Sequence, residues 1–278
     1  MKTSFLETVP DLDCHVVERD GCPIHVWTGG REEGPWFVML HGATMDHRMF
    51  NAQVEALAPH VRLLVWDARA HGRSQPIGAG FSIARCTHDL LAVLDALSID
   101  TAVVCGQSLG GYIAQELWRA APQRVDALVL IGTTPLFKAY SGLEVFLLRA
   151  SLPLFRIWPY GSLTRTIARQ TAVTPAARAY ALQACRQLTR ADFLTVWEAV
   201  SLAVDRHGRE DVAFDLPVLL LHGDQDRTGT IRRDMPRWAP ELPRATYQVI
   251  PDAGHNANQD NPDATNAAIL RFVQQAVR

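Results

Sequence analysis

Three features of the 278-residue sequence predict an α/β protein with a doubly wound, mostly parallel sheet and an inserted helical segment. Short apolar runs alternate with helical patterns along most of the chain, which is typical of strands buried between two layers of helices. A hairpin precedes this alternation, and a stretch without clear strands interrupts it. The length is sufficient for one large core that carries an insertion.

The first predicted elements are two strands, 15–18 and 24–27, which Asp20-Gly21 joins in an antiparallel hairpin. Six short apolar runs follow, each suited to a strand buried on both faces of a parallel sheet. They cover residues 36–40, 62–66, 101–105, 125–131, 218–221 and 246–250. Helical patterns lie between several of these runs, and a final helix is predicted at about residues 264–277.

The alternation stops between residues 136 and 210. This stretch is rich in Leu, Phe, Trp, Ala and Arg, has no clear strand, and contains three prolines that are expected to interrupt helices. We predict a helical cap there, inserted into a core formed by residues 1–135 and 211–278. The alternative is a set of extra helices that pack on the sheet edge without covering any site.

Composition and charge restrict the class of protein. A net charge of -2 gives no electrostatic reason to expect nucleic acid or an anionic membrane surface as a partner. No uncharged apolar run approaches the roughly 20 residues that span a bilayer, and the first residues do not resemble a secretory signal. The cysteines favour free thiols in a reducing compartment over a Cys14–Cys22 disulfide. Together these features predict a cytoplasmic protein without a membrane partner.

The segment Gly106-Gln107-Ser108-Leu109-Gly110 places a serine between a predicted strand and a predicted helix. A serine on so tight a turn needs small neighbours, which the two glycines provide. The turn would present the hydroxyl at the carboxyl end of the sheet, where open α/β folds bind ligands. The Leu109 N–H at the helix N-terminus is suited to stabilise an oxyanion. We therefore predict Ser108 as a nucleophile; the alternative is a glycine-rich turn without chemistry.

A second oxyanion donor is expected where another predicted strand ends. The run at 36–40 leads into His41-Gly42-Ala43, and the Ala43 N–H is the candidate. The imidazole of His41 is expected to be structural and to hydrogen-bond the loop backbone.

The serine needs a base, and the base needs a carboxylate that fixes its tautomer. His255 follows the run at 246–250 and is the predicted base, because its loop lies on the same rim as Ser108. Asp224 and Asp226 both follow the run at 218–221, so either could be the acid. The chain order Ser, Asp, His matches the triad order of this architecture.

These residues give the sequence a resemblance to the α/β-hydrolase superfamily over essentially the whole chain. His41-Gly42 resembles its oxyanion-loop motif, residues 67–74 resemble its D-x-R-G-x-G-x-S turn, and Ala253-Gly254-His255 resembles its terminal A-G-H. In that family the acid is the last residue of H-G-x-x-D, which implies Asp226. The resemblance therefore implies the α/β-hydrolase fold with Ser108, Asp226 and His255 as a triad.

The sequence departs from the family pattern at two positions in supporting loops. Ala70 replaces the usual glycine, and Gly229-Thr230 stands where a proline often follows the acid. The resemblance is greatest to small esterases, lactonases and cofactor-free haloperoxidases. Within these, the spacing of four residues resembles that of 3-oxoadipate enol-lactonases: Asp46, Met49, Phe50 and Gln53. A serine at the elbow differs from the aspartate of dehalogenases and epoxide hydrolases of this fold.

The function predicted from the sequence is hydrolysis of a small-molecule ester or lactone through an acyl-enzyme. No zinc-ligand spacing or phosphate loop occurs, so no metal or organic cofactor is implied.

Phe146 and Trp158 are predicted to roof an apolar pocket; the alternative is packing within the cap. Two other functions remain open: a C–C bond hydrolase or hydroxynitrile lyase with the same triad, and a ligand receptor without turnover. The oligomeric state is not predicted.

Overall fold

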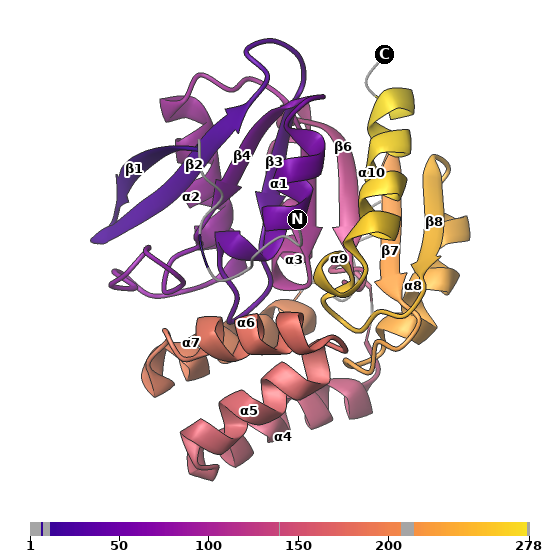
Figure 1. Cartoon of the computed structure of the whole chain (residues 1–278). Helices are drawn as coiled ribbons and strands as arrows, with labels where there is room; N and C mark the ends of the chain where they lie inside the picture. Colours follow the sequence, from indigo (N-terminus) through magenta and orange to yellow (C-terminus); the bar gives the residue numbers. More distant parts are fainter. Residues whose placement is uncertain (1–6, 8–11, 139, 207–213, 277–278) are drawn as a thin grey trace.

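An eight-stranded sheet forms the centre of the protein in a computed structural model that describes residues 7, 12–138, 140–206 and 214–276 (Figure 1). The strands are β1 (Asp13–Arg19), β2 (Cys22–Gly30), β3 (Trp36–Leu40), β4 (Arg62–Trp66), β5 (Ala102–Gln107), β6 (Val125–Ile131), β7 (Val218–Gly223) and β8 (Ala245–Ile250). The helices are α1 (Asn51–Leu57), α2 (Ile83–Ala96), α3 (Leu109–Ala120), α4 (Gly142–Ile157), α5 (Tyr160–Thr171), α6 (Pro175–Cys185), α7 (Arg190–Arg206), α8 (Ile231–Trp238), α9 (Ala257–Asp260) and α10 (Pro262–Ala276).

The strand order is β1-β2-β4-β3-β5-β6-β7-β8. The β1–β2 and β2–β4 pairs are antiparallel, and all the other neighbours pair in parallel. The predicted hairpin and all six predicted strands are therefore present. The hairpin is longer than predicted because the apolar pattern weakens at the ends of a strand with one exposed face.

Two apolar layers, one on each face of the sheet, make up the core. In β3, Val38 and Leu40 belong to the apolar layer that includes α2, α3 and α8, whereas Phe37 and Met39 belong to the layer that includes α1 and α10. Side chains alternate between the two layers in β5, β6 and β7 as well, as the two-residue period of a strand requires. This arrangement confirms the predicted doubly wound sheet.

Four helices, α4 to α7, lie between β6 and β7 at the carboxyl end of the parallel strands (Figure 1). The predicted boundary between cap and core, at residues 210 and 211, falls outside the described residues. Helix α10 begins two residues before the predicted final helix, and residue 277 also lies outside the described part. Among the helices that the structure describes, none is long and apolar enough to cross a bilayer. All five cysteines are free thiols.

Candidate active site

Ser108 occupies the turn between β5 and α3 with a strained backbone. Its φ of 51° and ψ of -112° lie in a region that residues other than glycine rarely adopt, at a cost of about 1–3 kcal/mol. The Ser108 N–H donates to the Ile131 carbonyl over 2.9 Å, which ties the turn to the end of β6. Strain of this kind is typical of a nucleophile elbow, because it lifts the serine above the sheet.

The elbow is possible because Gly106 and Gly110 have no side chains. A Cβ at Gly106 would lie 2.3 Å from the Gly110 oxygen, and a Cβ at Gly110 would lie 2.0 Å from the Leu40 oxygen. These separations are far shorter than any real contact between such atoms. The glycines predicted from the sequence therefore allow β3, β5 and α3 to approach one another at this point.

Leu109 and Ala43 are the residues predicted to supply the two oxyanion donors. Leu109 is the first residue of α3, so its N–H has no acceptor within the helix. Ala43 follows β3, and both residues line the same cavity as Ser108. Within the described residues, no acceptor is found for either N–H. Both are therefore available to an oxyanion formed near the serine.

Two neutral histidines fix the loop that carries Ala43. His41 donates from Nδ1 to the Gly42 oxygen over 2.8 Å and accepts from the Ala68 N–H at Nε2 over 3.0 Å. Burial lowers the pKa of His41, which favours the neutral ring that this pattern needs. The predicted structural role of His41 agrees with these bonds.

His71 has the same function one residue further along the loop. It accepts from the Thr44 N–H at Nε2 over 3.1 Å and donates to the Arg69 oxygen, and burial lowers its pKa to about 3. Sequence reasoning missed His71. Its position in the 67–74 turn was the signal that could have identified it.

His255 and Asp226 form the hydrogen-bonded pair that a serine base requires. The His255 Nδ1 donates to Asp226 Oδ2 over 3.0 Å, and both side chains are buried. Burial would raise the pKa of Asp226, but the charge of His255 and hydrogen bonds from His255 and the Thr228 N–H lower it overall. The exposed Asp224 instead accepts from the Ala253 N–H over 3.0 Å. Of the two candidate acids, Asp226 is the one that meets the histidine.

Because Nδ1 of His255 bonds Asp226, the other ring nitrogen, Nε2, takes no part in this pair. The Gln107 side chain donates to the His255 carbonyl over 3.0 Å, which joins the histidine loop to the residue before Ser108. A Cβ on Gly132 would lie 3.2 Å from Nδ1, so β6 also limits the position of the ring. The imidazole is thus held by groups from three strand ends.

Ser108 and His255 line one cavity of about 480 Å³ between the sheet and the cap. Its roof is apolar and comes from α4, α5, α7 and the residue that follows α4. The large side chains there are Leu148, Phe155, Trp158, Leu163, Phe193 and Trp197. Such a cavity accommodates a small molecule with an apolar portion. Trp158, one of the two residues predicted for the roof, lines this cavity.

The prediction for Phe146 was wrong. Its side chain is 64% exposed and does not line the cavity, although it belongs to α4 as Leu148 and Phe155 do. Helix α4 is apolar on two sides, so the sequence pattern could not show which side faces inward.

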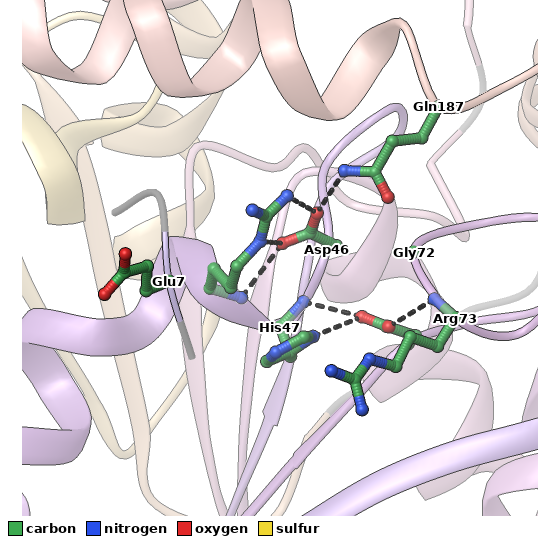
Figure 2. A pocket seen from close by; sticks show the side chains of 8 residues that line it. Glu7, Asp46, His47, Gly72, Arg73 and Gln187 are labelled. Carbon is green, nitrogen blue, oxygen red and sulfur yellow. Dashed lines mark hydrogen bonds and ion pairs between the residues drawn. The ribbon is translucent and has the colours of Figure 1, made fainter. Parts of the chain in front are cut away.

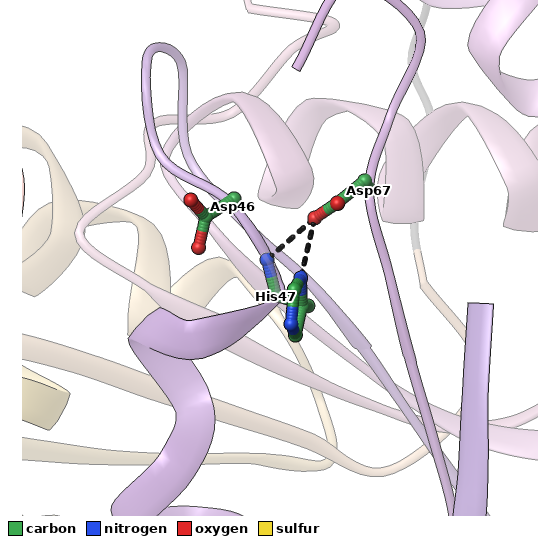
Figure 3. A group of neighbouring side chains, drawn as sticks. All are labelled: Asp46, His47 and Asp67. Carbon is green, nitrogen blue, oxygen red and sulfur yellow. Dashed lines mark hydrogen bonds and ion pairs between the residues drawn. The ribbon is translucent and has the colours of Figure 1, made fainter. Parts of the chain in front are cut away.

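A second cavity, of about 430 Å³, lies beside residues 46–48, in the segment that follows Ala43 (Figure 2). Asp46, His47 and Asp67 line it, and each offers a metal-ligand atom within 4.8 Å of the others (Figure 3). The His47 Nδ1 and backbone N–H both donate to Asp67, over 2.9 and 2.8 Å. Asp46 is paired with Arg48, whose Nη2 lies 2.6 Å from Oδ2.

This donor set does not fit a metal ion. The carboxylates already accept hydrogen bonds from His47 and Arg48, and the Arg48 guanidinium would repel a cation. The cluster also has a structural effect, because Gln187 of the cap donates to Asp46 (Figure 2). The Tyr180 hydroxyl of α6 donates to Asp46 as well. The cluster therefore fastens the cap to the loop that carries Ala43.

Comparison with known proteins places the chain in a family. Residues 35–262 match the family described as alpha/beta hydrolase fold. The chain is 29% identical over 251 residues to a pimeloyl-[acyl-carrier protein] methyl ester esterase of Pectobacterium carotovorum, covering 85% of this chain and 93% of the relative. It is 27% identical over 277 residues to 3-oxoadipate enol-lactonase 1 of Acinetobacter baylyi, covering 93% and 96%.

Solved structures show the same architecture. A thermophilic esterase from Thermogutta terrifontis superimposes with a TM-score of 0.78 at 22% identity, over 96% of this chain and 100% of that one. The enol-lactonase from Burkholderia xenovorans gives 0.78 at 21% identity, over 94% and 100%. The family match, with relatives named as esterase and enol-lactonase, shows that the protein is a hydrolase. The chain belongs to the α/β-hydrolase family.

Proposed function

We propose that this protein is a serine hydrolase that cleaves a carboxylic ester or lactone through an acyl-enzyme. One observation carries the proposal: Ser108, on a strained strand-to-helix turn, shares a cavity with a His255 whose Nδ1 lies 3.0 Å from Asp226. The names of the relatives, methyl ester esterase and enol-lactonase, support an ester bond as the target.

In the acylation step the two ring nitrogens of His255 have different roles. Ser108 attacks the carbonyl carbon while the His255 Nε2 accepts the hydroxyl proton, and Asp226 stabilises the imidazolium through Nδ1. The Ala43 and Leu109 N–H groups donate to the oxyanion, and each such donor typically contributes about 10²–10³ in kcat. The tetrahedral intermediate collapses when His255 returns the proton to the leaving alkoxide.

Deacylation repeats these steps with water as the nucleophile. His255 removes a proton from water, which attacks the acyl carbon, and the proton then returns to the Ser108 oxygen. The carboxylic acid leaves and the free serine is restored. In a lactone the leaving alkoxide stays attached to the acyl group, so a single hydroxy acid is released.

The low pKa of Asp226 matters for both half-reactions. Because the carboxylate stays ionised well into the acid range, it holds the proton of His255 on Nδ1 at neutral pH. The Nε2 lone pair then points away from Asp226 and is available to the serine.

Turnover of a panel of short esters and lactones tests this function. Wild-type protein should hydrolyse several of them over many turnovers, with a burst of alcohol product if deacylation limits the rate. Ser108→Ala should lower kcat by roughly 10⁵–10⁶-fold, as in other triad enzymes, without lowering the melting temperature by more than a few degrees.

Either of two results would contradict this proposal and favour another function. Turnover of a vinylogous diketone or a cyanohydrin in preference to every ester would indicate a C–C hydrolase or a lyase with the same triad. One equivalent of acylation without further turnover would indicate a ligand receptor.

A further inference from the structure

Helix α4 is apolar on the side that faces solvent as well as on the side that faces the cavity. Five large side chains on its outer side have exposed fractions of 47–79%: Leu143, Phe146, Leu147, Leu154 and Ile157. They recur at steps of three, four and seven residues, so they form one line along the helix, the α4 stripe. Of the described residues, only eight large apolar side chains are strongly exposed, and these are five of them. A contiguous apolar patch of this kind marks an interaction surface.

The cap is also basic, although the protein as a whole is slightly acidic. Residues 136–210 contain ten Lys and Arg against five Asp and Glu, whereas the rest of the chain contains 17 against 24. Arg149 and Arg156 are exposed, and their helical spacing places both along one border of the α4 stripe. Helix α5, which follows α4 in the chain, adds the exposed Arg165 and Arg169.

We propose that the α4 stripe docks the cap onto an anionic lipid surface. The helix would lie in the plane of the interface, with its aliphatic side chains among the acyl chains and the arginines on the phosphates. Long arginine side chains suit this position because their stems can lie along apolar material while the charge stays hydrated. The net charge of -2 concealed this surface, because it averages a basic cap with an acidic body.

Other occupants fit these observations less well. A second copy of the cap would bring the same excess of arginines face to face, which opposes association. A protein partner usually meets aromatic anchors in a pocket, and leucine is under-represented among the residues that dominate such interfaces. Four of the five stripe residues are aliphatic, and a fluid hydrocarbon layer accepts them without a matching shape.

Docking in this orientation has a consequence for the cavity. Leu148 and Phe155 line it from the opposite side of the same helix, so the lipid surface would lie one helix away from the Ser108 cavity. Apolar esters dissolved in the bilayer would then be concentrated beside the cap. The docking itself does not depend on the proposed function, because lipid binding is measured without turnover.

Cosedimentation with vesicles tests the proposal. The full chain should bind vesicles of equal parts phosphatidylcholine and phosphatidylglycerol, bind phosphatidylcholine alone far less, and be released by high salt. The double variant Leu147→Glu/Ile157→Glu should reduce binding at least about tenfold, because two carboxylates would enter the apolar layer. The matched control, Val16→Glu/Val249→Glu, changes two exposed apolar residues of the sheet edges and should bind as the wild type does.

A water-soluble short ester serves as the check on folding, and all three proteins should hydrolyse it at similar rates. The proposal is overturned if the wild type does not bind the anionic vesicles, or if the α4 variant binds as well as the wild type does. Suppose that vesicles are not bound but the mass of the protein in solution rises with its concentration, and that the α4 variant abolishes this rise. The stripe would then be assigned to contact with a second copy. Capture of an acidic protein through the stripe, again without vesicle binding, would assign it to a protein partner.

Discussion

Asp224 and Asp226 lie two residues apart in one loop, yet their carboxylates have different partners. Asp226 is buried against His255, and Asp224 is exposed and caps the backbone at Ala253. The local sequence left both candidates open, since a carboxylate at either position follows the same strand. Only the family motif favoured Asp226, and the turn at residues 223–226 explains why: it directs one side chain inward and the other outward.

Asp226→Asn should therefore lower kcat by about 10⁴-fold while substrate binding is retained, because an amide favours the wrong imidazole tautomer. Asp224→Asn is the matched control and should lose less than about tenfold, since its hydrogen bond supports only the loop. Steady-state kinetics on one good ester measure both. A larger loss for Asp224→Asn would move the acid two residues toward the N-terminus of the loop.

At the scale of the element, the apolar pattern of α4 could not show which side of the helix faces the cavity. The segment that contains α4 was predicted only as part of a helical cap, and apolar residues on two sides of the helix gave no direction for the cavity. Phe146 and Trp158 were therefore assigned to the same pocket, and only Trp158 lines it. Packing against α7 decides which side of α4 faces inward, and the sequence of α4 alone does not determine that packing.

This difference gives a paired test of the cap. Trp158→Ala should change the ratio of kcat/KM between short and long esters by roughly 10-fold or more, because it removes apolar contact from the cavity roof. Phe146→Ala should leave the ratio unchanged, since its side chain points to solvent. Equal profiles for Trp158→Ala and the wild type would mean that the roof takes no part in substrate choice.

Helix α8 is joined to the start of the cap by an ion cluster around the buried Asp234. Its carboxylate accepts from Thr230 over 2.6 Å and from Arg233 over 2.7 Å, and Lys138 lies 3.1 Å away. Burial would raise the pKa of Asp234, but these bonds lower it to about 2. Arg233 also binds Glu144 in the first turn of α4.

Asp234→Asn should lower the free energy of unfolding at pH 7 by about 1–3 kcal/mol, since it removes charged hydrogen bonds. Because the folded pKa lies below the ordinary 3.8, the contribution is complete above pH 3.8 and is lost as the pH falls toward about 2. Urea unfolding of both proteins at several pH values measures the difference. A difference that stayed constant down to pH 2 would show that the Asp234 charge is not its source.

At the scale of the whole molecule, the sheet and the elbow were predictable because they rest on local rules. Apolar runs of four to seven residues predicted the strands after the hairpin, although β8 at the sheet edge is only partly buried. The Gly106 and Gly110 contacts show why the motif at Ser108 has its spacing. The roof of the cavity was not predictable in detail, since it depends on how four cap helices pack together. His71 and Asp67 were also missed, because their roles depend on loops that meet only in the folded chain.

The reactivity of Ser108 tests the central claim most directly. A fluorophosphonate should add one adduct per chain, seen as a single mass increase, and peptide mapping should place it on the segment that contains Ser108. Ser108→Ala should remain unlabelled, and a substrate ester should slow labelling of the wild type by competing for the cavity. Labelling on another segment, or equal labelling of Ser108→Ala, would contradict the assignment of Ser108 as the nucleophile.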